Sequence, residues 1–331
     1  MKNVMIYGTL GPACRDPKTL ERMLSEGMDG MRLNLSHTAL EDAADLIAAY
    51  RAAAEACGKT PALLIDMQGP ELRIGSLPAP IRLHDGDSVG TDAIPFPQAV
   101  RQVLNSASAG QKVLLDDGKI LLTKTASDRL HAERGGILES RKSVALPGLS
   151  IPSPAMTEAD RHHIRIAKAY GVTAVMQPFV RSSADLLEVR RALNEAGCGD
   201  IRLLAKVENT DGIAHLDELI PCCDEIVIAR GDLGNAVPLW TLPAVQKRIA
   251  AACRAAGRDF MVVTQMLDSM THRPVPTRAE VSDIFNAVLD GAASVMVTGE
   301  TASGDYPVET IRYLKRTVRE AEAYLRSTRT V

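Results

Sequence analysis

The chain has 331 residues, of which 46% are hydrophobic and 24% charged, so it can bury a large core and leaves little room for long disorder. Its 38 basic and 41 acidic residues give a net charge of −3, which is not the balance of a nucleic-acid or anionic-membrane binder. Aromatic residues make up only 3%, too few for base-stacking platforms or sugar-binding walls.

Cysteine usage and the first residues indicate a cytoplasmic protein. The six cysteines show no C-x-x-C or Cys/His ligand spacing, and we interpret the pair Cys222 and Cys223 as ordinary reduced thiols. The opening residues MKNVMIYGTLGP are typical of a strand and turn rather than a signal peptide. No apolar run approaches the ~18 residues of a membrane span. We therefore expect a cytoplasmic chain with neither membrane nor nucleic-acid partners.

Short β-rich runs alternate with longer helical patterns along the chain, which is typical of parallel βαβ units. The eight runs lie at residues 4–9, 30–35, 62–66, 174–179, 202–207, 225–229, 260–265 and 294–298. Eight strands with helices between them favour an α/β fold, a (β/α)8 TIM barrel, over a doubly wound open sheet, which strand count alone leaves as the alternative. One helical stretch, residues 183–197, begins on serines suited to N-capping and ends on a glycine suited to the C′ position.

The interval between the third and fourth runs has no long helical repeat. From about residue 75 to residue 146 it contains short β-like runs, the turn signal Asp-Asp-Gly at 116–118 and a proline-rich patch at 78–97. We predict a small β domain at residues 74–146, inserted after strand 3 of a barrel made by residues 1–73 and 147–331. Loops at this end of a barrel carry the active site, so the insert is a candidate lid.

Polar residues gather at the ends of several runs. Arg32, Asn34 and Ser36 are spaced two residues apart, so strand geometry places them on one side, where they suit an anion beside a cation. A solvated strand end is the alternative. Lys206 and Glu208 share one side of a buried strand, where charges are costly unless they are paired or metal-bound.

A second carboxylate, Asp232, follows the next run within Ala-Arg-Gly-Asp-Leu-Gly at 229–234. Two carboxylates from neighbouring strand ends suit a hard divalent cation, and a lysine beside it can offset charge on a phosphoryl group or an enolate. The glycines of this segment let backbone N–H groups approach a carboxylate closely. A structural ion pair is the competing interpretation.

Eight segments, in order along nearly the whole chain, resemble the pyruvate kinase family. They are TLGPAC (9–14), RLNLSH (32–37), DMQGPELR (66–73), AKVEN (205–209), ARGDLG (229–234), TQMLDSM (264–270), RPVPTRAE (273–280) and GETASGDYP (299–307). The resemblance implies a phosphotransferase that converts phosphoenolpyruvate and ADP to pyruvate and ATP, with Mg²⁺ (or Mn²⁺) and K⁺ as cofactors.

The resemblance also implies residue roles. Arg32 and Lys206 would hold the phosphoryl group, and Glu208 and Asp232 would bind the divalent metal. The substrate carboxylate would lie against Gly231, Asp232 and Thr264. Thr298 would supply a hydroxyl to the proton network of the enolate. The potassium site would consist of Asn34, Ser36, Asp66 and the carbonyl of Met67, and the nucleotide contacts would be Pro12, His37, Arg73 and Lys142.

Some positions depart from the family's pattern. Ser303 stands where the family usually has lysine, Ala236 where it has glutamate, and Pro178 and Thr298 where it has serine. Glu71 matches the potassium-dependent branch of the family. The insert looks shortened, and we expect the family's C-terminal domain to be absent. Without that domain a tetramer is not expected, while barrel-to-barrel contacts leave a homodimer open.

Two other functions remain open from sequence. One alternative to the phosphotransferase is a binding or regulatory protein that kept the pocket without turnover. The other is a different metal-enolate barrel enzyme, such as a pyruvate-releasing aldolase or a biosynthetic phosphotransferase. Retention of the two carboxylates and the lysine argues against the first, and the nucleotide-facing segments argue against a lyase.

Overall fold

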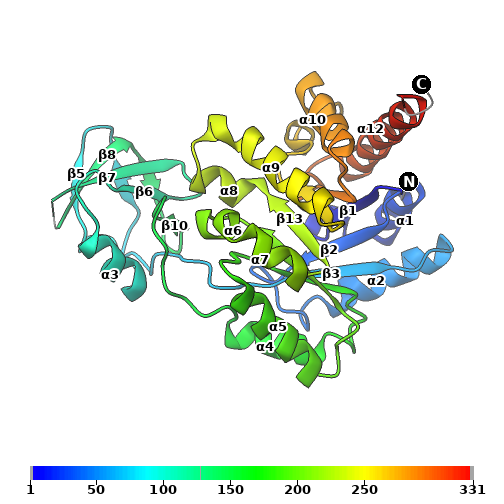
Figure 1. Ribbon diagram of the computed structural model, residues 1–331, viewed down its shortest axis with the longest axis horizontal. Helices are drawn as coiled ribbons and strands as arrows, with labels where there is room; N and C mark the ends of the chain where they lie inside the picture. Colours follow the sequence, from blue (N-terminus) through cyan, green and yellow to red (C-terminus); the bar gives the residue numbers. More distant parts are fainter. Residues whose placement is uncertain (1–2, 127, 329–331) are drawn as a thin grey trace.

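Eight parallel strands close into a barrel in the structure, a computed structural model that describes residues 3–126 and 128–328 (Figure 1). The barrel strands are β1 (Met5–Thr9), β2 (Gly30–Asn34), β3 (Ala62–Asp66), β11 (Ala174–Gln177), β12 (Arg202–Val207), β13 (Glu225–Ala229), β14 (Asp259–Val263) and β15 (Ser294–Met296). Each strand pairs with its neighbour in this order, and β15 pairs with β1. The predicted barrel is therefore confirmed, and the open sheet is excluded.

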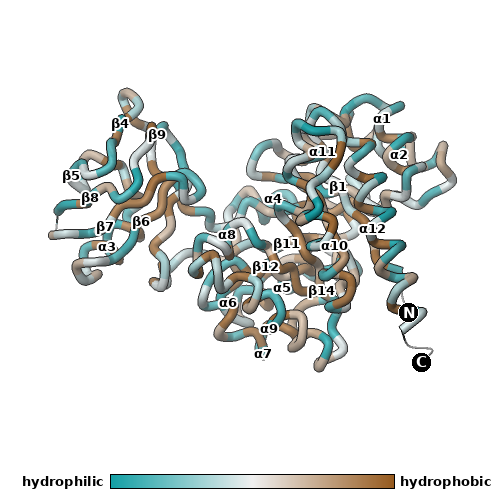
Figure 2. The backbone as a smooth tube through the Cα atoms, turned by 90° about the horizontal axis from the view of Figure 1, so that it is seen from above, coloured by the Kyte–Doolittle hydropathy of each residue, from teal (hydrophilic) through white to brown (hydrophobic). Residues whose placement is uncertain are grey.

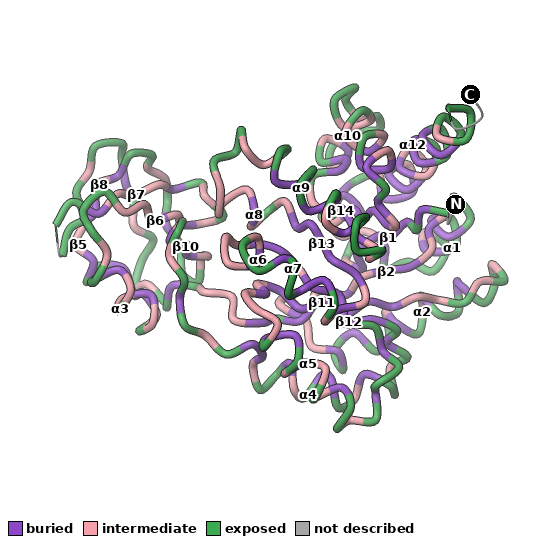
Figure 3. Tube along the Cα trace, viewed as in Figure 1, coloured by how far each residue is buried: buried purple, intermediate pink, exposed green. Residues whose placement is uncertain are grey.

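Alternation along each strand separates two hydrophobic layers. Leu64, Leu204 and Val227 belong to a cluster that fills the barrel interior, whereas their neighbours in sequence, such as Ile65 and Leu203, pack between strands and helices. These side chains are buried, and Figure 3 shows that buried residues run along the barrel strands. Because the period is two residues, the positions two residues beyond these inward residues, at the carboxyl ends of the strands, also face the barrel axis.

An outer layer of helices covers the barrel. The helices are α1 (Pro17–Ser25), α2 (Ala44–Ala56), α4 (Glu158–Ile166), α5 (Ser183–Glu195), α6 (Thr210–Ala214), α7 (Leu216–Leu219), α8 (Arg230–Ala236), α9 (Leu242–Ala255), α10 (Arg278–Leu289), α11 (Gly299–Ala302) and α12 (Pro307–Thr328), with short 3-10 turns at Pro12–Cys14, Ile220–Cys222, Leu239–Thr241 and Asp268–Thr271. None of the described helices combines the length and the apolar character needed to cross a membrane.

Local signals explain several helix ends. α4 and α10 begin with capping boxes at Thr157 and Thr277. α5 follows Ser182 at the N-cap, but this serine side chain makes no capping hydrogen bond, so the predicted serine cap is wrong in that detail. The predicted glycine at the other end is confirmed, since Gly197 adopts a φ of 66°.

The segment between β3 and β11 forms a separate lobe beside the barrel, at the left of Figure 1. Its elements are β4 (Ile81–Leu83), β5 (Ser88–Gly90), α3 (Gln98–Ser106), β6 (Lys112–Leu115), β7 (Ile120–Ala126), β8 (Arg129–Arg134), β9 (Gly136–Leu138) and β10 (Val144–Ala145). They form a five-stranded and a two-stranded sheet. Figure 2 shows hydrophobic residues gathered along its central strands and, separately, along the barrel strands.

The lobe has its own core, and this supports the predicted insertion after strand 3. Its buried cluster runs from Ile74 to Ile151, so the boundary at residues 146/147 stays a prediction, with core residues extending a few positions beyond it. The helix α3 was not expected. Its C-terminal carbonyls are capped by the buried ammonium of Lys124, which donates to the carbonyls of Leu104, Asn105 and Ala107.

Two antiparallel chain segments join the lobe to the barrel. The amide of Ile74 donates to the carbonyl of Lys142 and the amide of Val144 to the carbonyl of Leu72, each at 2.9 Å, and Arg73 forms a bridge with Ser143. The outgoing and returning segments are therefore hydrogen-bonded to each other as a short two-stranded connection.

Candidate active site

Four charged side chains meet at the carboxyl end of the barrel because of the strand period. Asp66 lies two residues after the inward Leu64, and Lys206 lies two residues after the inward Leu204. Arg32 pairs in register with Leu64, and Glu208 follows Lys206 by another two residues. All four side chains are buried or nearly so, with 2–13% of their surface exposed.

These four side chains form a continuous chain of ion pairs. The ammonium of Lys206 lies 3.0 Å from Oδ2 of Asp66 and 3.0 Å from Oε1 of Glu208. Arg32 donates to the same Asp66 oxygen through Nε at 2.8 Å and Nη2 at 2.7 Å. Asp66 is thus the common partner of the two cations that were predicted to hold a phosphoryl group.

The surroundings shift the pKa values in opposite directions. Burial works against the charged form of Asp66, yet Lys206 and Arg32 hold the pKa of this carboxyl below its usual value. Burial also opposes the charge of Lys206, but Asp66 and Glu208 raise the pKa of its ammonium well above the usual range. This lysine therefore stays protonated, as a group that stabilises an anion must.

The two predicted metal ligands behave differently from Asp66. Burial raises the pKa of Glu208, with Lys206 opposing the rise. Burial and the charge of Glu208 raise the pKa of Asp232, in the first turn of α8, to about 7, and Glu71 and Asp117 add to the rise. The carboxyl-terminal end of the barrel, called the mouth below, therefore holds acids whose negative charge the protein does not fully compensate.

A divalent cation fits this arrangement. Glu208 and Asp232 line the same cleft between the barrel and the insert, and both are acids that a nearby positive charge would favour in the ionised form. No group of three or more His, Cys, Asp or Glu side chains within residues 3–126 and 128–328 is arranged to hold a metal ion. The donor set is thus two carboxylates, which leaves coordination positions for other oxygens.

Glu208 has a further partner that sequence reasoning missed. The amide of Phe179 donates to its Oε2 at 2.8 Å, and Phe179 adopts a φ of 52°, which is unusual for a bulky residue. Pro178 precedes it and packs close to Gly69. A proline–aromatic pair after β11 gives no pattern from which such an amide donor could be predicted.

The predicted seat for a substrate carboxylate lies where β13 and β14 end. Gly231 approaches Thr264 so closely that a Cβ at Gly231 would lie 3.2 Å from Cγ2 of the threonine. Thr264 has a φ of 75° and Gln265 a φ of 55°. The structure therefore brings these two predicted residues together in a strained turn.

Thr298 follows β15 and is held by Glu300, which sequence reasoning missed. The Thr298 amide donates to Oε2 of Glu300 at 2.7 Å, and its hydroxyl does so at 3.3 Å. The other oxygen of Glu300 accepts from the amide of Leu267 at 3.2 Å. This buried glutamate thus connects the loops after β14 and β15.

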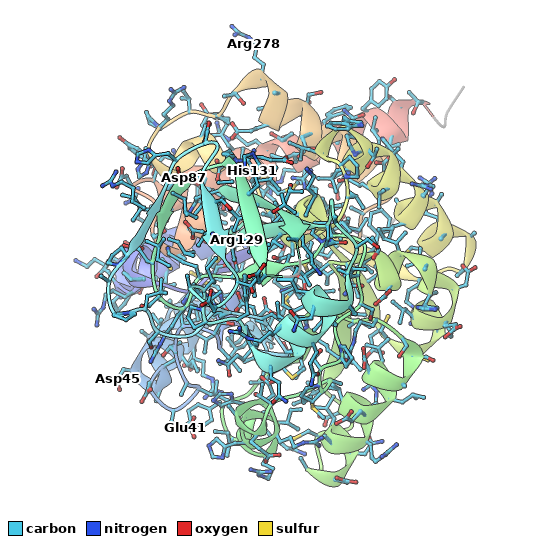
Figure 4. The ribbon with its side chains drawn as sticks, turned by 90° about the vertical axis from the view of Figure 1, so that its left-hand side faces the viewer. Glu41, Asp45, Asp87, Arg129, His131 and Arg278 are labelled. Carbon is cyan, nitrogen blue, oxygen red and sulfur yellow. The ribbon has the colours of Figure 1, made fainter. Side chains whose placement is uncertain are left out.

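A cleft of about 800 Å³ lies at the ends of β1, β2 and β15. It brings together Pro12, His37, Arg32 and Thr298 with Ser303. The hydroxyl of Ser303 donates to the carbonyl of Gly299. Glu41, in the turn before α2, and Asp45, in the first turn of α2, lie at the edge of the molecule (Figure 4).

The other two predicted nucleotide residues lie outside this cleft. Arg73 pairs with Glu71 at 2.7 Å and lines a neighbouring hollow with His37. Lys142 lies on the connection to the insert and pairs with Asp116 at 3.1 Å and Glu139 at 3.3 Å. Their contact with a nucleotide stays a prediction that requires these ion pairs to change.

The predicted potassium ligands lie near one another at the end of β2 and β3, whose residues Asn34 and Asp66 are paired in register. Ser36 lies in the turn after β2 rather than in the strand, and its amide donates to Oδ1 of Asn34 at 3.1 Å. The loop that contains Met67 is held by Asp160, which accepts from the amides of Gln68 and Gly69. Asp66 is occupied by its two cationic partners, so a potassium role for this residue stays a prediction.

Comparison with known proteins agrees with this geometry. A family model described as "Pyruvate kinase, barrel domain" matches residues 1–311. The pyruvate kinase of Geobacillus stearothermophilus is 36% identical over 338 residues, covering 98% of this chain and 58% of that protein. The human pyruvate kinase PKLR is 37% identical over 350 residues, covering 97% and 60%.

A pyruvate kinase of Methylorubrum extorquens is 37% identical over 333 residues, covering 97% of this chain and 69% of that protein. The chain thus spans about three fifths of the length of the first two relatives. The family model covers most of the chain, including every barrel strand. The chain therefore belongs to the pyruvate kinase family.

Proposed function

We propose that this chain transfers the phosphoryl group of phosphoenolpyruvate to ADP and releases pyruvate and ATP. The observation that supports this most directly is the buried chain of Arg32, Asp66, Lys206 and Glu208, with Asp232 beside it at the mouth. Phosphoryl transfer needs fixed positive charge and positioning more than covalent chemistry, and this arrangement supplies both.

The roles follow from the contacts. Arg32 and Lys206 would bind the phosphoryl oxygens as the bond between phosphorus and the enol oxygen breaks and a bond to the terminal phosphate oxygen of ADP forms. Lys206 would then offset the negative charge left on the enolate oxygen. Thr264 and the backbone at Gly231 would fix the carboxylate. The enolate would take a proton at its methylene carbon, and Thr298, oriented by Glu300, is suited to the proton network.

Glu208 and Asp232 would hold Mg²⁺ or Mn²⁺, which when bound would neutralise part of the charge on the substrate's oxygens. For K⁺ we propose Asn34, Ser36 and the Met67 carbonyl, with Asp66 and Glu71 nearby. We also propose a cytoplasmic location, because all six cysteines are free thiols, which is typical of a reducing compartment.

A coupled assay for pyruvate release tests the proposal. With phosphoenolpyruvate, Mg²⁺ and K⁺, the rate should depend on a nucleoside diphosphate, scanned over ADP, GDP and the pyrimidine forms. Lys206→Met should lower kcat by about 1000-fold, because it removes the cation that faces the developing charge. The matched control is Lys247→Met on the outer helix α9. It breaks a 2.7 Å ion pair with Asp290, the residue that follows α10, and should leave kcat unchanged.

Two results would contradict the proposal. Failure to release pyruvate with every nucleoside diphosphate and every monovalent ion tested would exclude the kinase function. Binding of phosphoenolpyruvate measured by calorimetry, without any turnover, would instead favour a regulatory binding protein.

A further inference from the structure

Arg230 is a nearly buried cation to which the roles above assign nothing. It is the first residue of α8 and comes directly after β13. Only 11% of its side chain is exposed. An arginine in such a place needs several partners, because a buried charge without them is strongly unfavourable.

The guanidinium reaches from the end of β13 to the loop after the next strand. Nε and Nη2 both donate to the backbone carbonyl of Thr264, at 3.1 and 2.7 Å. Nη2 also lies 3.0 Å from the sulfur of Met266. On its other side, Nη1 lies 2.6 Å from Oδ2 of Asp283, on the inner side of α10, whose first residue, Arg278, points away from the molecule (Figure 4).

The carbonyl that Arg230 binds belongs to a strained turn at the end of β14. Thr264 and Gln265 both adopt left-handed backbone conformations, which are unfavourable for a β-branched residue and persist only when the surroundings enforce them. Two charge-assisted hydrogen bonds to one carbonyl supply such enforcement. The adjacent Gly231 lets α8 approach, since a Cβ there would press on the threonine methyl.

We propose that Arg230 is a positioning residue for the substrate-carboxylate seat: held by Asp283, it fixes the Thr264 turn and thereby directs the threonine side chain into the site. This inference rests on the proposed function for its kinetic consequence, but not for its structural one. The Thr264 hydroxyl has to occupy one position relative to Gly231, and a shift of about 1 Å in such a group can cost about 100-fold in rate.

The chain contains a matched pair for comparison. Arg190 on α5 lies 2.6 Å from Asp224 through Nη2 and donates to the carbonyl of Ile201 through Nη1 at 3.2 Å. It has the same pattern of one carboxylate and one carbonyl, but lies by the amino-terminal ends of β12 and β13, at the opposite end of the barrel. A purely structural role for Arg230 would make the two arginines equivalent.

The test compares Arg230→Lys with Arg190→Lys. Lysine keeps the charge but cannot bind one carbonyl twice and a carboxylate as well. We expect Arg230→Lys to lower kcat/KM for phosphoenolpyruvate by about 100-fold. The KM for ADP should stay within about twofold of the parent, because Thr264 does not line the cleft that contains Pro12 and His37. Asp283→Asn should cause a smaller loss, about tenfold, and Arg190→Lys none beyond about twofold.

A double-mutant cycle separates positioning from general damage. If Arg230 acts through Thr264, then adding Arg230→Lys to Thr264→Ala should cost little more than Thr264→Ala alone. Additive losses, or equal effects of the Arg230 and Arg190 changes, would overturn the proposal.

Amide hydrogen exchange gives a readout that does not need turnover. Residues 264–267 should exchange faster in Arg230→Lys and at the parental rate in Arg190→Lys. If the parent shows no kinase activity but this local change is seen, the positioning role stands and the proposed function fails. If the parent is active and the exchange of residues 264–267 is unchanged, the positioning role fails alone.

Discussion

The two ends of the barrel both bury carboxylates beside arginine, and they use them differently. At the amino-terminal end, Glu225 is 2% exposed, accepts a short hydrogen bond from the hydroxyl of Ser294, and pairs with Arg202 at 2.9 Å. Burial raises the pKa of this acid, while Ser294 and Arg202 act against the rise. Burial of the nearby Tyr7, together with the negative charge of Glu225, raises the pKa of this tyrosine to about 12.

At the carboxyl-terminal end, the acids outnumber their partners. Asp66 is saturated by two cations, but Glu208 shares Lys206 with it, and Asp232 meets mainly other acids. A buried carboxylate is therefore not by itself the mark of an active site. The mark is an acid that the protein leaves undercompensated and that faces a cleft, because a ligand can then supply the missing charge.

Glu208→Gln gives the largest expected effect and tests the carboxyl-terminal end of the barrel. It should lower kcat by about 1000-fold, because the site loses a proposed anionic metal ligand and one of the two carboxylate partners of Lys206. The melting temperature measured without divalent ions should not fall, since the change also relieves repulsion with Asp232. A large loss of stability without ligands would mean that this end, too, is built for folding.

Glu225→Gln tests the amino-terminal end of the barrel and should have an intermediate effect. The substitution weakens the hydrogen bonds to Ser294 and Arg202, so we expect a loss of about 1–3 kcal/mol in the free energy of unfolding, measured by urea titration. The kinetic constants at saturating metal should stay at the parental values. A fall in kcat that exceeds the loss of folded protein would break the distinction between the two ends.

The smallest expected effect is a proton released when Mg²⁺ binds. The pKa of Asp232 is raised from 3.8 to about 7 without metal, so between these values the folded protein keeps a proton that the unfolded chain has lost. Stability should therefore fall as the pH rises through this window. Added Mg²⁺ should displace the proton at pH 6 but hardly at pH 8.

Calorimetry in two buffers of different ionisation enthalpy measures this proton release directly. Asp232→Asn should abolish it, and Asp117→Asn should only diminish it, because Asp117 contributes less to the rise than burial and Glu208 do. Equal proton release from the parent and from Asp232→Asn would show that another group titrates.

Much of the barrel could be predicted from sequence because its signals are local. Three of the eight strands, at residues 62–66, 202–207 and 225–229, coincide with the predicted runs, since apolar β-rich stretches and their turns are legible without tertiary information. The inward placement of Arg32 and Lys206 followed from the two-residue period. The helix α3 escaped notice because a nine-residue helix amid turn residues has too few repeats to stand out.

The parts of the site that sequence did not reveal are contacts between strand ends far apart in the chain. Asp66 appeared as an ion ligand, but its two cationic partners come from strands 34 and 140 residues away in sequence. The Phe179 amide, Glu300 and Arg230 matter through backbone conformations and through bonds to neighbouring loops. No composition or spacing predicts that a threonine will be left-handed or that an arginine will bind its carbonyl.

The paired segments that carry the insert have a mechanical consequence. Two hydrogen-bonded strands side by side bend across their width more easily than they stretch or twist. The connection therefore favours one direction of bending. A movement of the lobe relative to the barrel would then follow this one bending direction. Arg73 and Lys142 lie on the two paired segments. The same bending movement would therefore change the positions of both side chains together.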